Sequence, residues 1–158
     1  MGFLEWLENT PLALFIREYD SIWAYPTILF LHTLGLGAVA GFSTFLDLRV
    51  LGFARGVPFA ELRPFTTAVW FAFAVAALSG TALFIANAVS KAHSPVFGIK
   101  LVFIAVAIAV HYVMTKRIFR NPLAEQSPLP RQARVLAIVS IACWVGATTA
   151  GRLLAYLG

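Results

Sequence analysis

Cysteine and methionine are both scarce in this sequence, and each scarcity excludes a kind of site. Cys143 is the only cysteine, so the chain can form no intrachain disulfide and no cysteine-rich metal site. Met1 and Met114 are the only methionines. A copper site built on His111 and Met114 is therefore disfavoured, because thioether copper sites use several methionines.

Charge is scarce too, which excludes an ordinary soluble protein. Of the 158 residues, 60% are hydrophobic and only 12% are charged, a composition typical of integral membrane proteins. The formal net charge is +5, but the basic residues gather beside apolar stretches, so we expect no nucleic-acid partner. The N-terminus carries glutamates where a signal peptide carries basic residues, so we expect no cleavage there.

Four apolar stretches are each long enough for a membrane-spanning helix, which needs about 20 residues. They lie at about 22–46, 64–88, 95–115 and 133–157. The sequence predicts an all-α, four-helix membrane bundle that forms one domain over residues 1–158. Residues 1–20 are predicted to lie in the interface as two short amphipathic pieces, the second with Thr10 as N-cap, Pro11 at N1 and its end near Glu18.

Lysine and arginine are distributed unevenly between the connecting segments, which predicts an orientation. Arg17 and Lys91 lie on one predicted side. The other side holds Arg49, Arg55, Arg63, Lys116, Arg117, Arg120, Arg131 and Arg134. Since cytoplasmic loops are enriched in basic residues, we expect a multi-pass protein of the bacterial inner membrane with both termini on the outer, periplasmic side.

Two ionisable residues share one face of the third predicted span. The eleven residues from Lys100 to His111 turn a helix through about 1100°, which leaves the two side chains about 20° apart. Ile104 and Ala107 lie between them on this stripe. Burying an ionisable group costs roughly 2.5 to 3.5 kcal/mol at mid-membrane, so such residues indicate function. The ordinary alternatives are that His111 is a packing residue and that Lys100 extends to the interface.

His32 and Arg152 are the other ionisable residues within predicted spans. His32 lies about 15 Å from the outer end of its span, while Arg152 and Lys100 both lie about 7 Å from the outer ends of theirs. Because Cβ atoms tilt toward a helix's N-terminus, Arg152 is expected to be aimed into the membrane. A cation aimed inward indicates an anionic ligand, although His32 could also be a simple packing residue.

Haem would use all of these residues, because it needs imidazole ligands, cations for its propionates, and small residues beside its ring. No Cys-x-x-Cys-His sequence occurs, so any haem is b-type. Whether the histidines share one iron or serve two haems stays open, as does any part for His93. The candidate iron ligands are His32 and His111, and the candidate cations that pair with the propionates are Lys100 and Arg152. The small residues expected to leave space beside the haem ring are Gly35, Gly80 and Ala107.

Several segments resemble a family of small four-span bacterial membrane proteins of unknown function. The segments are LEWLENTPLALFIRE, WAYPTILFLHTLGLG, SPVFGIK and GRLLAY. More loosely, the chain is similar to four-helix b-type membrane cytochromes and to the membrane domain of copper-resistance proteins, whose intramembrane histidines bind haem. That resemblance implies haem ligation, but this chain has too few histidines for two bis-histidine haems within one protomer.

The leading hypothesis is a b-type membrane cytochrome that transfers electrons as a carrier rather than as an enzyme, with a quinone or redox protein as partner. One alternative is a channel or carrier for a small anion or protons. Another is a structural membrane subunit.

Small residues at Gly35, Gly37 and Gly41 also predict a homo-oligomer, either a dimer or a trimer.

Overall fold

The computed structural model describes residues 2–18, 23–121 and 128–157, and within these ranges the chain is all-helical. The expected all-α fold is therefore confirmed. Residues 1, 19, 20 and 22 of the segments predicted above lie outside the described residues. The elements are α1 (Phe3–Glu8), α2 (Pro11–Glu18), α3 (Ala24–Leu51), η1 (Phe59–Leu62), α4 (Arg63–Ala86), α5 (Ala88–Ala92), α6 (Pro95–Met114), η2 (Thr115–Phe119) and α7 (Arg131–Leu157).

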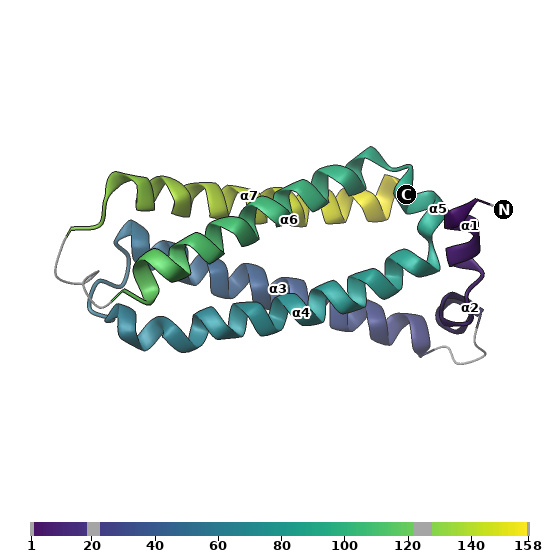
Figure 1. The fold of residues 1–158 in the computed structure, drawn as a ribbon, viewed down its shortest axis with the longest axis horizontal. Helices are drawn as coiled ribbons and strands as arrows, with labels where there is room; N and C mark the ends of the chain where they lie inside the picture. The colour runs from purple at the N-terminus through teal and green to yellow at the C-terminus, as the bar shows by residue number, and fades with distance from the viewer. Residues whose placement is uncertain (1, 19–22, 122–127, 158) are drawn as a thin grey trace.

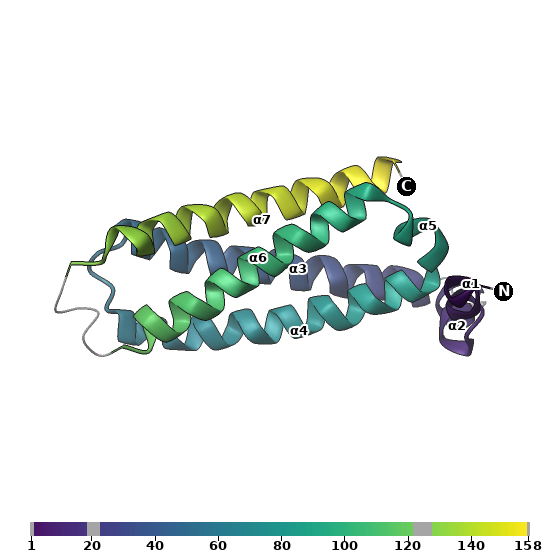
Figure 2. The same cartoon turned by 45° about the horizontal axis from the view of Figure 1, so that its top comes forward.

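Four long helices run lengthwise beside one another (Figure 1). Helices α3, α4, α6 with η2, and α7 are each long and apolar enough to cross a membrane. Helix α3 packs against α4 and α7, and α6 packs against α7, whereas α4 and α6 contact each other little. Figures 1 and 2 show why: α6 runs diagonally, close to α7 where it follows α5 and close to α4 at its other end.

Helix α3 is longer than the sequence predicted, which changes the setting of Asp47. The predicted span ends at about residue 46, which leaves Asp47 and Arg49 in the connecting segment that follows it. In the structure α3 continues to Leu51 and Asp47 is only 3% exposed. The helix ends at Gly52, whose φ of 107° suits a glycine C-cap. Arg49 belongs to the surface end, where its Nε donates to the Val57 carbonyl.

The N-terminal helices α1 and α2 lie across one end of the bundle (Figures 1 and 2). Thr10 acts as the expected cap, since its Oγ1 accepts from the Ala13 N–H at 3.4 Å, and Pro11 begins α2. Glu8 Oε1 accepts from the Val89 N–H at 2.9 Å, which ties α1 to α5. Helix α5 was not predicted, because five residues between two long spans give too short a pattern.

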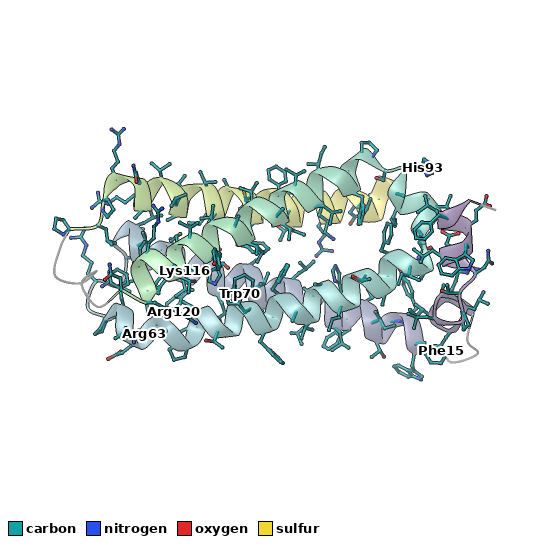
Figure 3. The ribbon with its side chains drawn as sticks, in the orientation of Figure 1. Phe15, Arg63, Trp70, His93, Lys116 and Arg120 are labelled. Atoms are coloured by element: carbon teal, nitrogen blue, oxygen red, sulfur yellow. The ribbon has the colours of Figure 1, made fainter. Side chains whose placement is uncertain are left out.

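The basic residues gather at the opposite end of the bundle. Figure 3 shows Arg63, Lys116 and Arg120 at the end where α4 begins and η2 lies, while His93 lies at the end covered by α1 and α2. This distribution is the one on which the predicted orientation rests. The membrane itself and the side on which each end lies remain predictions.

Candidate cofactor-binding pocket

A pocket of about 550 Å³ lies among α3, α4, α5, α6 and α7, in the half of the bundle nearer α5. Its volume lies within the roughly 300–1,000 Å³ typical of cofactor sites, as does its mainly apolar lining with a few polar groups. The polar groups include two lysines, a histidine and an amide. The lining residues include His32, Phe84, Lys91, Phe97, Lys100 and Trp144.

His32 is held with one ring nitrogen free for a ligand. Its Nδ1 lies 2.9 Å from the carbonyl oxygen of Ala76 on α4. Because a carbonyl oxygen only accepts, Nδ1 carries the hydrogen and donates it, and Nε2 keeps a lone pair. The Ser79 hydroxyl lies 3.3 Å from the same Nδ1 and itself donates to the Val75 carbonyl at 2.6 Å. Metal-binding histidines are commonly oriented by such a carbonyl partner.

Gly80 makes room for the His32 ring. A Cβ at position 80 would lie 2.8 Å from His32 Cε1 and 3.1 Å from Nδ1. The sequence predicted that Gly80 would leave space for a ligand, and the structure shows that this space is occupied by the histidine. Gly80 therefore fixes where the imidazole lies, and both residues line the pocket.

Gly35 and Ala107 lie in the packed core rather than in the pocket lining. A Cβ at Gly35 would lie 2.9 Å from the backbone nitrogen of Ala76, so α3 and α4 approach closely at this point. Ala107 is fully buried. Gly35 still acts on the site indirectly, because Ala76 is the residue whose carbonyl holds His32.

The two cations proposed for an anionic ligand have different surroundings. Lys100 is half-buried and lines the pocket, and its Cε would lie 3.7 Å from a Cβ at Gly151 on α7. Arg152 is exposed and is not part of the described pocket lining. Lys91, which the sequence analysis placed only in an outer link, does line the pocket. The pocket therefore brings Lys100 together with Lys91 rather than with Arg152.

His111 lies in the core beyond the pocket. It is 4% exposed, its Nε2 lies 3.4 Å from Thr115 Oγ1, and its ring meets the Trp70 ring with centroids 5.8 Å apart. Among the described residues, the pocket lining includes His32 but not His111. The stripe predicted on α6 does face the interior: Lys100 and Ile104 line the pocket, and His111 is buried.

An aromatic pair at the pocket went unrecognised in the sequence. Phe84 on α4 and Phe97 on α6 stack with centroids 5.3 Å apart and an interplanar angle of 12°, and both line the pocket. Nothing local distinguishes them from the other phenylalanines of the apolar spans. Their pairing depends on how α4 and α6 are arranged, which spacing within one helix does not reveal.

His93 is exposed and lies away from the pocket lining. Its Nδ1 donates to the Val89 carbonyl, 2.7 Å away, within the same helical turn. It is thus a natural comparison residue for His32, with an equivalent carbonyl partner but a position outside the lining of this pocket.

Comparison with known proteins gives a family without an assigned function. No curated protein and no solved structure matches the chain. The sequence model of one family, described as "Family of unknown function (DUF6644)", matches residues 3–157. The match covers nearly the whole chain, in agreement with the family resemblance seen in the sequence, and the protein belongs to this family.

Proposed function

We propose that the pocket binds a b-type haem and that the protein is a membrane electron carrier. The observation that carries the proposal is the hydrogen bond from His32 Nδ1 to the Ala76 carbonyl, which leaves Nε2 as a ligand in a largely apolar pocket. When bound, haem would supply one-electron chemistry at its iron. His32 would ligate its iron, and Lys100 would pair with its propionates.

The donor set fits haem better than a bare metal ion. Among the described residues, no three histidine, cysteine, aspartate or glutamate side chains are grouped to hold a metal. A haem iron needs only axial ligands from the protein, because the macrocycle supplies four nitrogens. One haem per pocket is proposed, since His111 is engaged by Thr115 and Trp70 outside the lining.

The proposed setting is the bacterial inner membrane, with the four long helices spanning it and α1 and α2 at the outer interface. Exposed apolar side chains on these two helices support that placement, among them Phe3, Trp6 and Leu12. A dimer or trimer stays a prediction. Gly37 and Gly41 are exposed with open space beside them, so their small size is not used within the protomer.

A carrier for a small anion is the second candidate, because Lys91 and Lys100 both line the pocket. Two lysines near one cavity attract an anion whether or not it belongs to a haem. Anion flux into liposomes by colourless, haem-free protein would support this candidate over the cytochrome.

The absorption spectrum of protein purified from haem-supplied cells tests the cytochrome proposal. We expect a Soret band, with an α-band after dithionite, and we expect His32→Ala to abolish both because the proposed axial ligand is removed. His93→Ala is the matched control and should keep the full spectrum. His111→Ala should keep the haem while lowering stability, through loss of its buried contacts. A wild-type protein without a Soret band would contradict the proposal.

Lys100→Gln should lower the reduction potential of the bound haem by tens of millivolts, on the order of 1 kcal/mol. The oxidised iron carries one more positive charge than the reduced iron. Removing a nearby positive charge therefore stabilises the oxidised state relative to the reduced state, and the potential falls. Arg152→Gln should leave the potential unchanged, because Arg152 is exposed and outside the lining. Potentiometric titration of both variants checks this, and equal shifts would argue against a specific role for Lys100.

A further inference from the structure

Four buried polar side chains lie on α3 and α7, two helices that pack against each other, and each has a polar atom without a hydrogen-bond partner. They are Ser43 and Asp47 on α3 and Ser140 and Trp144 on α7. Asp47 is 3% exposed, and the other three are 1–2% exposed. Buried polar groups are nearly always paired, so a group of unpaired ones requires an explanation.

Helical geometry makes these residues one cluster. Ser43 and Asp47 are one turn apart on α3, and Ser140 and Trp144 are one turn apart on α7. The Asp47 carboxyl faces the Ser140 hydroxyl, but the Ser140 oxygen and Asp47 Oδ2 do not meet in a hydrogen bond of good geometry. The two helices run in opposite directions (Figure 1), so Ser43 lies level with Trp144.

No cation among the described residues neutralises Asp47. Arg49 donates to the Val57 carbonyl and lies over the Phe59 ring, 4.2 Å from its centroid, and Arg63 donates to the Phe119 carbonyl. The other charged or titratable groups near this end of the bundle do not neutralise it either. His111 is engaged on α6, and Cys143 is buried on α7 as a thiol. The exposed groups are Arg55, Glu61, Tyr112, Lys116, Arg117, Arg120, Arg131 and Arg134.

An ionised carboxylate in this place would be a buried, uncompensated charge, which is among the least favourable arrangements in a protein interior. A protonated carboxyl removes the charge and gains a donor of its own. The Trp144 indole N–H only donates, so it suits a carboxyl or water oxygen and cannot ligate a metal cation.

We infer that Asp47, with Ser43, Ser140 and Trp144, forms a proton-binding site in the bundle interior, and that its resting state is the neutral acid. The reaction is the uptake of one proton by the carboxylate and its release to water, with no change of oxidation state. Asp47 lies four residues before the end of α3, about 6 Å along the helix axis. This short distance makes the end of the bundle that bears Arg63 the side from which the proton is exchanged.

Aspartate occurs only at positions 20 and 47, which makes the site directly observable by isotope labelling. Protein labelled with carboxyl-¹³C aspartate should give two carboxyl NMR signals, one with the chemical shift of a protonated acid at neutral pH. Asp20→Asn should leave that signal in place, and Asp47→Asn should remove it. This experiment needs no haem, so its result is independent of the proposed cytochrome function.

Infrared spectroscopy gives a second measurement on the unsubstituted protein. We expect a protonated-carboxyl stretch that shifts in D₂O, persists in the control Glu61→Gln, and is lost in Asp47→Asn. Because the labelled wild type reports on Asp47 directly, failure of Asp47→Asn to fold leaves the test intact. An ionised Asp47 at neutral pH would overturn the inference. So would displacement of the proton signal by sodium or potassium, which would identify a metal-cation site.

Discussion

Gly35→Ala is expected to destabilise the folded bundle by about 1–3 kcal/mol relative to a Gly→Ala substitution at an open position of the same helix. The added Cβ would lie 2.9 Å from the backbone nitrogen of Ala76. Backbone cannot rotate away as a side chain can, so α3 and α4 must separate. Thermal or denaturant unfolding in detergent, followed by circular dichroism, measures the loss.

The matched controls for Gly35→Ala are Gly37→Ala and Gly41→Ala on the same helix. A Cβ at either position has no atom within 4 Å, so each should gain up to about 1 kcal/mol from the higher helix propensity of alanine. Comparing variants on one helix removes that propensity contribution. If all three variants had equal stability, the close approach of α3 and α4 would be refuted.

Gly80→Ala is expected to weaken haem binding roughly 10–100-fold while the helices remain folded, the range found when a metal ligand loses its orienting partner. The new Cβ would lie 2.8 Å from His32 Cε1. The ring must rotate or shift, which breaks the hydrogen bond from Nδ1 to the Ala76 carbonyl. Haem titration monitored at the Soret band measures the change, with Gly98→Ala as control because its surroundings are open.

A double-mutant cycle isolates the contact between Gly80 and His32. In the wild-type background Gly80→Ala carries the cost of displacing the ring, whereas in a His32→Ala background the obstacle is gone. We expect a coupling free energy of about 0.5–3 kcal/mol in unfolding measurements, as is typical of residues in contact. Additive effects would mean that the ring does not occupy the space beside Gly80.

The helices were largely predictable from the sequence, because long apolar stretches and the Thr10–Pro11 start are local signals. The end of α3 was not. The apolar stretch ends at about residue 46, whereas the helix continues to Leu51 and ends at Gly52, whose φ is 107°. Asp47 therefore falls beyond the predicted span, although in the structure it belongs to α3 and is buried against α7.

The pocket was only partly predictable. Spacing correctly placed Lys100 and Ile104 on an inward face, because that depends on one helix alone. It could not determine which helices meet, and so it did not reveal the contact between His32 and Ala76 or the stacking of Phe84 on Phe97. Those contacts depend on tertiary packing between α3, α4 and α6.

The diagonal course of α6 has a consequence for how a ligand arrives. Helices α4 and α6 contact each other little, and Thr81 on α4 and Leu101 on α6 both line the pocket while remaining exposed on the outside. With the four long helices in a membrane as proposed, this side of the pocket meets lipid chains. A hydrophobic molecule then enters by lateral diffusion in the bilayer, and its occupancy follows its mole fraction in lipid rather than its concentration in water.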